Sequence, residues 1–396
     1  MAINAFSASL LSALLLFQPA VSDAIEFRDT QGLYEALTHE NLNDVDFLRS
    51  SGLSVGGWIA AGGNYNPDHP VDRSNTPVSF NYRANEFNLE QLNLFVERQT
   101  VTGSDQWGLG GRFDGMFGLD SPFTQAAGHW DQHLIDDNDL RFYKVAIPQA
   151  YAEVYAPFGN GVTAKIGRFY TIIGYESVAS PPNFFYSHTY SMKSSPFTHT
   201  GVLLSYPLQS NLTFYSGAVT GVDNFDRQFG AWSYLGGFNW TGEDNATSFS
   251  FSVLNGDVSE TLDDNLTYLS AVFQYPLTER LHYVLQHDRG RQDNVMGAGT
   301  ETAEWYSIVQ YLTYSITDSL GAGLRAEWFR DQHGVRYGAG EAGYYALTGG
   351  LNWKPLNWLT VRPEIRYEWA DAASPAFSGG TQQDQFLAGA DFVVQF

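Results

Sequence analysis

Ionised and apolar side chains alternate along residues 360–369, and this alternation restricts the fold more strongly than any other feature of the sequence. A period of two places successive side chains on opposite faces of a β-strand. The ionised set and the apolar set therefore lie on different faces: Arg362, Glu364, Arg366 and Glu368 against Val361, Pro363, Ile365, Tyr367 and Trp369. Each unpaired charge in a dry core would cost several kcal/mol. The alternation thus favours a strand that faces hydrocarbon on one side and water on the other.

Similar segments of about ten residues follow one another from residue 52 to the C-terminus, as in outer-membrane barrels. Arg112 with Asp114, and Arg325 with Glu327, are again out of phase with their apolar neighbours. About sixteen segments are expected, beginning near Leu53, Phe87, Trp107, Pro148, Val162, Thr200, Leu212, Ala231, Ala246, Leu266, Leu281, Glu304, Leu320, Tyr345, Leu359 and Gln385. The phase changes before Leu92, which predicts a β-bulge near Glu90 or Gln91. The predicted fold is all-β, a transmembrane antiparallel β-barrel of about 16 strands.

The connections between these segments alternate in length. Short turns are expected at 159–161, 209–211, 242–245, 278–280, 317–319 and 355–357, and longer connections at 66–84, 120–146, 174–198, 288–300, 331–343 and 371–384. Bacterial outer-membrane barrels have short periplasmic turns and long extracellular loops. The sequence therefore predicts a barrel in the outer membrane of a Gram-negative bacterium, with both termini in the periplasm. Aromatic residues beside the short turns would form an interfacial girdle, unless they only reflect β-propensity: Tyr155, Tyr206, Trp240, Tyr275, Tyr314, Trp353 and Trp358.

The composition excludes several other classes of protein. The mean hydropathy is -0.24, and no stretch after the N-terminus has the roughly 18 to 20 apolar residues that a membrane helix needs. The chain has no cysteine, so disulfides and thiolate metal sites are excluded. A formal net charge of -22 argues against a nucleic-acid partner, which would require a basic face.

Three regions are predicted along the chain. Residues 1–24 are interpreted as a signal peptide because residues 8–17 form an apolar core and Ala24 ends a small-residue cleavage site. The region before the core is atypical because it has no Lys or Arg, so a short buried helix is the alternative. Residues 25–51 form an N-terminal segment, with a short helix near 30–37, in the periplasm or in the lumen. Residues 52–396 form the barrel.

Three stretches and the C-terminus carry a resemblance to a known family. The stretches are 161–176 (GVTAKIGRFYTIIGYE), 183–201 (NFFYSHTYSMKSSPFTHTG) and 212–224 (LTFYSGAVTGVDN). They resemble the β-barrel porins of the OmpL-like family over residues 52–396. The chain ends on Phe396, like the C-terminal signal that the barrel assembly machinery reads. The resemblance implies a barrel and a general porin role, and it implies no particular solute.

A barrel of 16 to 18 strands is wide enough for an aqueous channel. We therefore expect passive diffusion of small hydrophilic solutes or ions, without cofactor, metal site or catalytic residues. The pore-lining candidates are the inward charges: Arg112, Asp114, Arg325, Glu327, Arg362, Glu364, Arg366 and Glu368. The connection 174–198 holds the place at which general porins fold a loop inward, and it supplies candidates for a constriction: Glu176, Tyr186, His188, Tyr190 and Lys193.

Two interpretations of these charges are open. The loop could face the arginines across the pore and create a transverse field, since charged rings set ion preference. Alternatively, the loop only caps the barrel, and the arginines pair with Glu327, Glu364 and Glu368.

Other partners and activities are also considered. Acidic residues gather in two presumed loops, where they would bind cations that bridge lipopolysaccharide or would simply be solvated: Asp131, Asp136, Asp137, Asp139, Asp257, Glu260, Asp263 and Asp264. General porins of this size form homotrimers, but the sequence does not identify an interface. The alternatives to a porin are an outer-membrane hydrolase and an adhesin or receptor that acts through its loops. His129 and His133 are close in sequence but lack a third metal ligand.

Overall fold

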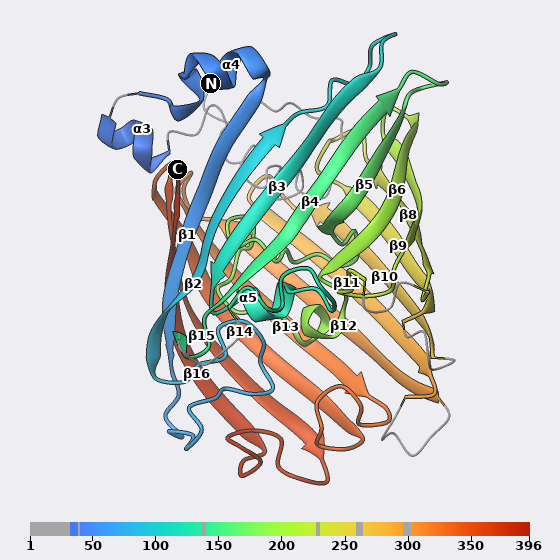
Figure 1. Cartoon of the computed structure of the whole chain (residues 1–396). Coiled ribbons are helices and arrows are strands. Elements are labelled where there is room, and N and C mark those ends of the chain that lie inside the picture. The colour runs from blue at the N-terminus through green and yellow to red at the C-terminus, as the bar shows by residue number, and fades with distance from the viewer. Residues whose placement is uncertain (1–31, 39, 136–139, 227–229, 259–263, 296–301) are drawn as a thin grey trace.

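A computed structural model describes residues 32–38, 40–135, 140–226, 230–258, 264–295 and 302–396. Sixteen antiparallel strands form one closed barrel in which each strand pairs with its sequence neighbours and β1 pairs with β16 (Figure 1). Closure leaves no sheet edge with unpaired backbone groups. A structure that crosses hydrocarbon must satisfy its backbone polar groups internally in this way. The predicted fold class and strand number are confirmed.

The strands have the following bounds: β1 Leu53–Tyr65, β2 Glu86–Arg98, β3 Gly108–Gly118, β4 Lys144–Ala156, β5 Val162–Tyr170, β6 Thr198–Gln209, β7 Leu212–Val219, β8 Ser233–Thr241, β9 Ser248–Asp257, β10 Asn265–Pro276, β11 Leu281–Asp293, β12 Thr302–Ser315, β13 Leu320–Asp331, β14 Ala342–Leu356, β15 Leu359–Ala372 and β16 Asp384–Gln395. Each begins within four residues of its predicted start. The predicted bulge is also present, because Ala60 and Ala61 of β1 pair with Gln91 and Leu89 and leave Glu90 without a partner in register.

The C-terminal residue completes the closure of the barrel. The backbone N–H of Phe396 donates to the carbonyl oxygen of Gly57 at 3.1 Å, and the N–H of Gly57 donates to the carbonyl oxygen of Phe396 at 3.0 Å. The ring of Phe396 also lies against Gly57, where a Cβ atom would meet it at 2.8 Å. A glycine at this position therefore leaves room for the terminal ring against β1.

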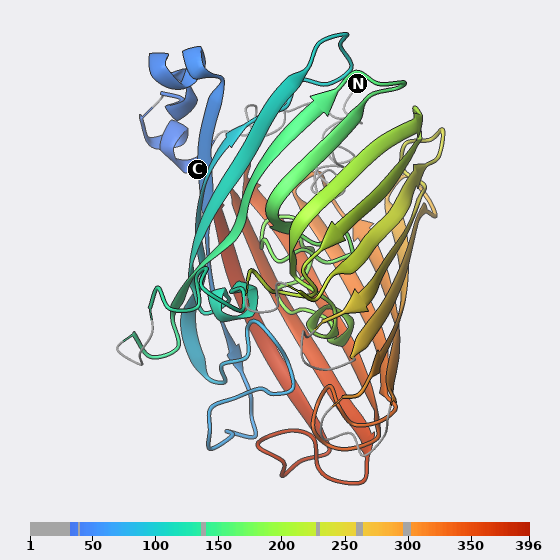
Figure 2. The same cartoon turned by 45° about the vertical axis from the view of Figure 1, so that its right-hand side comes forward.

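The short and long connections lie at opposite ends of the barrel (Figures 1 and 2). The C-terminus and the short turns share the upper rim in these views. Four of the long connections are used below and are named L1 (66–85), L2 (119–143, of which 136–139 lie outside the described residues), L3 (171–197) and L7 (332–341). By the asymmetry typical of outer-membrane barrels, the upper rim, with its short turns, corresponds to their periplasmic end, and the lower rim, with its long loops, corresponds to their extracellular end.

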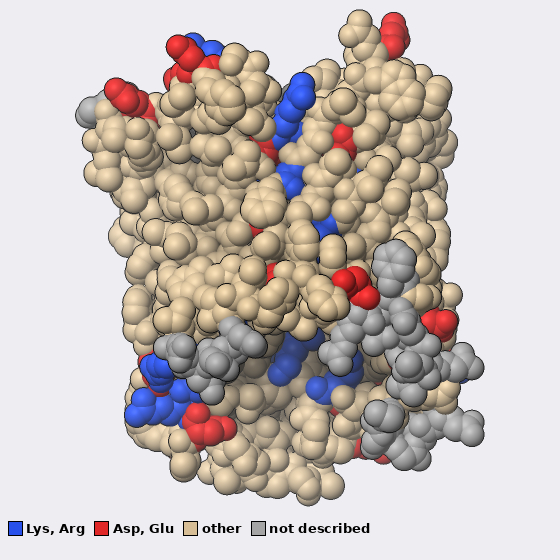
Figure 3. Space-filling model, viewed as in Figure 1, with Lys and Arg blue, Asp and Glu red and all other residues tan. Residues whose placement is uncertain are grey.

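The outer face of the barrel is largely apolar, as the alternation predicts. Large apolar side chains exposed on the strands include Phe87, Leu94, Phe113, Ile166, Leu204, Phe214, Leu324, Leu347, Leu351 and Ile365. On the face shown in Figure 3, most of the surface is uncharged, and acidic and basic groups lie toward the two ends and in a narrow central zone. No helix among the described residues is long and apolar enough to cross a membrane.

Four of the predicted girdle residues are exposed beside the short turns. Trp240, Tyr275, Tyr314 and Trp353 are between 36% and 47% exposed. Tyr155 does not fit the predicted girdle. It is buried, and its hydroxyl donates to the carbonyl oxygen of Ser104 in the connection between β2 and β3.

The N-terminal segment forms short helices at the periplasmic rim: α3 Leu33–Thr38, the 3-10 helix η1 Leu42–Asp44 and α4 Asp46–Ser51. Both views place α3 and α4 outside the barrel beside the C-terminus (Figures 1 and 2). The Asn43 side chain holds this segment to β1, because it donates to the Val55 carbonyl oxygen at 3.2 Å and accepts from the Val55 N–H at 2.8 Å. The proposed signal peptide, 1–24, lies outside the described residues.

Candidate functional site

L3 folds into the barrel and crosses its lumen. The backbone N–H groups of Tyr186 and Tyr190 donate to Glu364 of β15 and Glu327 of β13, at 3.1 and 3.0 Å. The Tyr186 hydroxyl donates to Glu90 of β2 at 2.5 Å. These carboxylates point inward from different parts of the wall. The loop is therefore an internal element of the barrel, and it carries a short helix, α6 Tyr190–Ser194.

Arg325 is the most heavily bonded anchor of L3. Its guanidinium donates to Glu327 at 2.9 Å on its own strand and to Glu176 of L3 at 3.0 Å. It also donates to the carbonyl and hydroxyl oxygens of Ser187, at 2.6 and 2.8 Å. The planar, forked guanidinium suits several acceptors at once. Arg325 is 0% exposed, so these bonds replace the water that the charge has lost.

The other inward arginines beneath L3 are also paired and buried. Arg362 bonds Asp391 of β16 and donates to the carbonyl oxygens of Ser180 and Asn183 at 2.9 and 3.0 Å. Arg366 bonds Glu327, and it bonds Glu368 at 2.6 Å. The loop therefore lies inside the barrel while the arginines pair with carboxylates, so features of both interpretations occur together. An ion preference set by these charges stays a prediction.

Arg112 and Asp114 form a separate pair on β3, and their described hydrogen bonds go to other strands rather than to L3. Arg112 donates to Asp114 at 2.6 Å and to Glu97 of β2 at 3.2 Å. Its guanidinium lies 4.1 Å from the centre of the Phe95 ring. Asp114 is fully buried and also accepts from Asn93 at 3.1 Å. Its neighbours hold the pair in a fixed geometry, and a role in lining the pore stays a prediction.

Glu176 links L3 to two elements of the barrel interior. Its carboxylate accepts from Arg325, from the Tyr311 hydroxyl of β12 at 3.1 Å and from the Thr189 N–H at 2.9 Å. Burial would raise the pKa of this carboxyl, but Arg325 and His188 outweigh burial and lower the pKa to about 2. Its stabilising effect is therefore present above the usual pKa of a glutamate and is lost as the pH falls toward 2.

His188 and Lys193 bond to neighbouring loops and to L3 itself. The His188 ring lies 3.3 Å from Glu176 and its centre is 4.6 Å from that of the Phe80 ring in L1. Lys193 donates to the carbonyl oxygen of Pro77 in L1. Its ammonium group also lies 5.3 Å from the centre of the Tyr337 ring in L7.

L1 and L7 hold L3 from the extracellular side, which the sequence analysis did not predict. Phe80 of L1 is 1% exposed, and its ring also contacts Phe197 at 5.5 Å. The Tyr337 hydroxyl of L7 donates to the carbonyl oxygen of Tyr190 at 2.6 Å. The signal available in the sequence was the occurrence of large apolar rings inside otherwise polar connections, since a solvated loop has no need of them.

Glycines in the wall make room for two aromatic rings of L3. Phe184 and Phe185 form an edge-to-face pair with ring centres 4.9 Å apart. A Cβ atom at Gly323 of β13 would lie 2.3 Å from Phe184 and 2.9 Å from Phe185. The absence of a side chain at Gly323 therefore allows the two rings to lie directly on the strand.

We expect Gly323→Val to displace these rings and to destabilise the barrel by about 1–3 kcal/mol, the usual cost of overpacking. Single-channel conductance should change with the position of L3, and urea unfolding in lipid vesicles should report the loss of stability. Gly349→Val is the matched control, because a Cβ atom there has nothing within 4 Å. If both variants retain the conductance and stability of the parent, the aromatic contact does not position L3.

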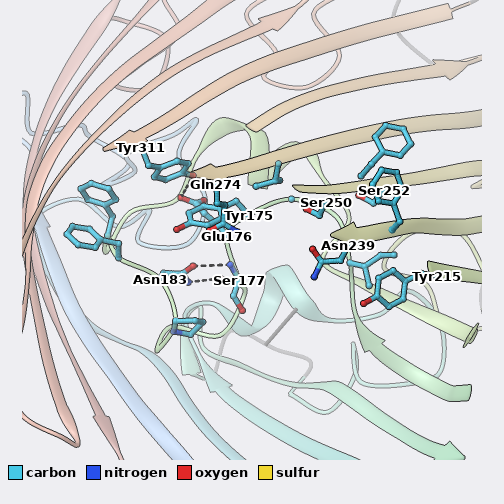
Figure 4. Close-up of a pocket in the computed structure, with 18 residues that line it drawn as sticks. Tyr175, Glu176, Ser177, Asn183, Tyr215, Asn239, Ser250, Ser252, Gln274 and Tyr311 are labelled. Atoms are coloured by element: carbon cyan, nitrogen blue, oxygen red, sulfur yellow. Dashed lines mark hydrogen bonds between the residues drawn. The ribbon is translucent and has the colours of Figure 1, made fainter. Parts of the chain in front are cut away.

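An open hollow remains between L3 and the wall formed by β7 to β10. It contains about 940 Å³ of empty space, open solvent included. Figure 4 shows Tyr175, Glu176 and Asn183 of L3 on one side and Asn239 and Ser250 of the wall on the other. Gln274 of β10 and Tyr311 of β12 also line it. None of the predicted pore-lining charges is among these lining residues, whereas Glu176 is.

The acidic residues and histidines considered in the sequence analysis form no metal site within the part of the chain that the structure describes. Asp131 is fully buried and accepts from the N–H groups of Ala126 and Ile147 at 2.8 and 2.7 Å, so it joins L2 to β4. Asp136, Asp137, Asp139, Glu260 and Asp263 lie outside the described residues. His129 pairs with Asp226 at 3.0 Å. Among the described residues, no group of three or more His, Cys, Asp or Glu side chains could hold a metal ion.

Comparison with known proteins gives a family and several similar folds. The sequence model of a family described as "Putative beta-barrel porin-2, OmpL-like" matches residues 52–396. No curated protein sequence matches the chain.

Three solved structures have a similar fold at low sequence identity. The outer-membrane channel DcaP of Acinetobacter baumannii is 11% identical, with a TM-score of 0.55 over 87% of this chain and 97% of that one. OmpT of Vibrio cholerae in its trimer form is 12% identical, with a TM-score of 0.55 over 87% and 99%. A mutant of the Rh. blastica porin is 13% identical, with a TM-score of 0.51 over 87% and 100%. These likenesses concern the fold alone.

Proposed function

Because this chain belongs to the OmpL-like β-barrel porin family and is an outer-membrane channel, we propose that small hydrophilic solutes cross it passively between L3 and the wall formed by β7 to β10. The observation that carries the proposal is the hollow beside L3, which adjoins the inward faces of β7 to β10. Ligand and solute paths favour such concave spaces with convergent polar groups. The buried, paired arginines on the opposite wall leave little room for solutes there.

The proposed path has a weak intrinsic ion preference. Glu176 is the one ionised side chain that lines the hollow in the described part of the chain, and its carboxylate is bonded to Arg325. Charges that are paired in close contact have fields that largely cancel at a distance. Any cation preference would therefore arise at the loops, in keeping with the net charge of -22, and would diminish as salt screens it.

Planar-bilayer recording on the purified full-length protein tests the proposal. We expect discrete conductance steps and a reversal potential under a KCl gradient that is modest and decreases at higher ionic strength. Vesicle-swelling assays should show entry of small polar solutes and slower entry of larger ones. A protein that inserts and yet gives neither conductance steps nor swelling would refute passive diffusion.

A channel without enzymatic activity is the proposed role, and a homotrimer is the proposed assembly. The family and fold are those of channels rather than of enzymes. The trimer proposal is supported only by the similarity of the barrel to that of OmpT, which has a trimer form. Native mass measurement in detergent tests it, and a monomer under conditions that preserve conductance would argue against it.

A further inference from the structure

We propose that the hollow beside L3 selects small, neutral, polyhydroxylated solutes over charged solutes of equal size. This inference rests on the proposed passive channel and specifies which solutes the channel favours. It follows from three properties of the lining. Several polar side chains bond to no other described residue, the one charged side chain is already paired, and aromatic rings are present.

Polar side chains on the wall side of the hollow are not used by the fold. Asn239 of β8, Ser250 of β9 and Gln274 of β10 line the space, and each is partly exposed. Within the described residues, none of these three side chains hydrogen-bonds to another residue. An amide carries donors and an acceptor, and a hydroxyl is both. Such groups can replace the water that a hydroxylated solute loses when it enters a confined space.

The lining offers no free charge to an ionic solute. Both oxygens of Glu176 are engaged, one by Arg325 and Tyr311 and the other by Thr189 and His188. Arg325 in turn is fully buried behind L3. An anion or cation that sheds part of its hydration shell here would gain no counter-charge, so its entry is disfavoured relative to that of a neutral solute.

Aromatic rings supply the third property. Tyr175 and Tyr311 lie with ring centres 4.8 Å apart beside Glu176, and Tyr215 of β7 lies on the opposite side of the hollow (Figure 4). Tyr311 and Tyr215 are buried, whereas Tyr175 is partly exposed, so Tyr175 is the tyrosine that a solute can contact. The faces of sugar rings carry C–H groups that pack on aromatic rings, while their edges carry hydroxyls. A lining that combines the ring of Tyr175 with neutral amides and hydroxyls matches both parts of such a solute.

The decisive experiment compares three solutes of nearly equal size in vesicle swelling: glucose, glucosamine and glucuronate. We expect glucose to enter at least about threefold faster than either charged analogue, since one hydrogen bond or lost counter-charge changes a rate by this order. The full-length protein should also show a concentration-dependent, saturable reduction of ion current by maltose in planar bilayers.

Variants test whether the named side chains cause the preference. The double variant Asn239→Leu/Gln274→Leu should raise the half-saturating maltose concentration by about tenfold, because two polar contacts are removed. Asn211→Leu, in the short turn between β6 and β7 and away from the hollow, should leave it unchanged. Ion conductance of the double variant in the absence of sugar reports that the barrel has folded.

The outcomes separate this inference from the proposed function. A protein without conductance or swelling refutes both. A conducting protein that passes glucosamine or glucuronate as fast as glucose refutes the solute preference and leaves the channel intact. A preference that persists unchanged in the conducting double variant shows that other residues cause it, which overturns the assignment to this hollow.

Discussion

Removal of the part of L3 that lies inside the barrel is expected to raise single-channel conductance by roughly two- to fivefold, because a 16-stranded barrel without an internal loop is an open pore. The variant deletes residues 177–194 and joins the ends with two glycines. Its strands should retain their pairing, because the described backbone hydrogen bonds of residues 177–194 stay within L3. Planar-bilayer recording gives the conductance, and far-UV circular dichroism reports whether the barrel has formed.

A disulfide between L3 and the wall provides the control for this deletion. The hydroxyl oxygens of Ser191 in L3 and Ser307 in β12 are 3.1 Å apart, which brings the two side chains within reach of a disulfide. The chain has no native cysteine to compete. The oxidised double variant Ser191→Cys/Ser307→Cys should conduct like the parent, because the loop is fixed where it already lies. A deletion that conducts no better than the parent would mean that L3 does not narrow the path.

The barrel could be predicted from the sequence because its cause is local. Each strand has to present apolar groups to lipid, so a period of two recurs wherever the chain crosses the membrane. The bulge at Glu90 was visible for the same reason, since a phase change between Leu89 and Leu92 needs one extra residue. The largest error in a strand start is four residues, at β4, where Pro148 suggested a boundary inside a strand that begins at Lys144.

The internal arrangement of the lumen could be predicted only in part. Alternation shows that Arg325 points inward, but it cannot show that Glu176, some 149 positions away, pairs with it. Such a pair depends on how a long loop folds, and the loop has no period to read. The same limit applies to Phe80, whose burial against L2 and L3 follows from contacts between three connections. Sequence patterns thus identified the inward charges, and the three-dimensional fold decides which of them meet water.

Replacing Arg325 by Met is expected to lower the free energy of unfolding by about 3–5 kcal/mol, the usual cost of removing one partner from a buried ion pair. Glu176 and Glu327 would both lose a partner that now lies within 3.0 Å, and Ser187 would lose a donor to its carbonyl oxygen. Arg325→Lys should lie between the parent and Met, because an ammonium keeps the charge but not the planar fork. Urea titration in lipid vesicles measures the loss, and protease cleavage within L3 should accelerate because the loop is anchored less firmly.

Arg289→Met tests whether burial, rather than the mere presence of an ion pair, accounts for this effect. Arg289 of β11 pairs with Glu304 at 3.1 Å, but its side chain is 57% exposed and remains hydrated. Exposed pairs contribute less than about 1 kcal/mol, so this variant should unfold nearly as the parent does and should cleave no faster within L3. Equal losses in Arg289→Met and Arg325→Met would contradict the view that the buried pairs hold L3. A large loss confined to Arg325→Met would mean that the loop inside the channel and the stability of the barrel depend on the same buried charge.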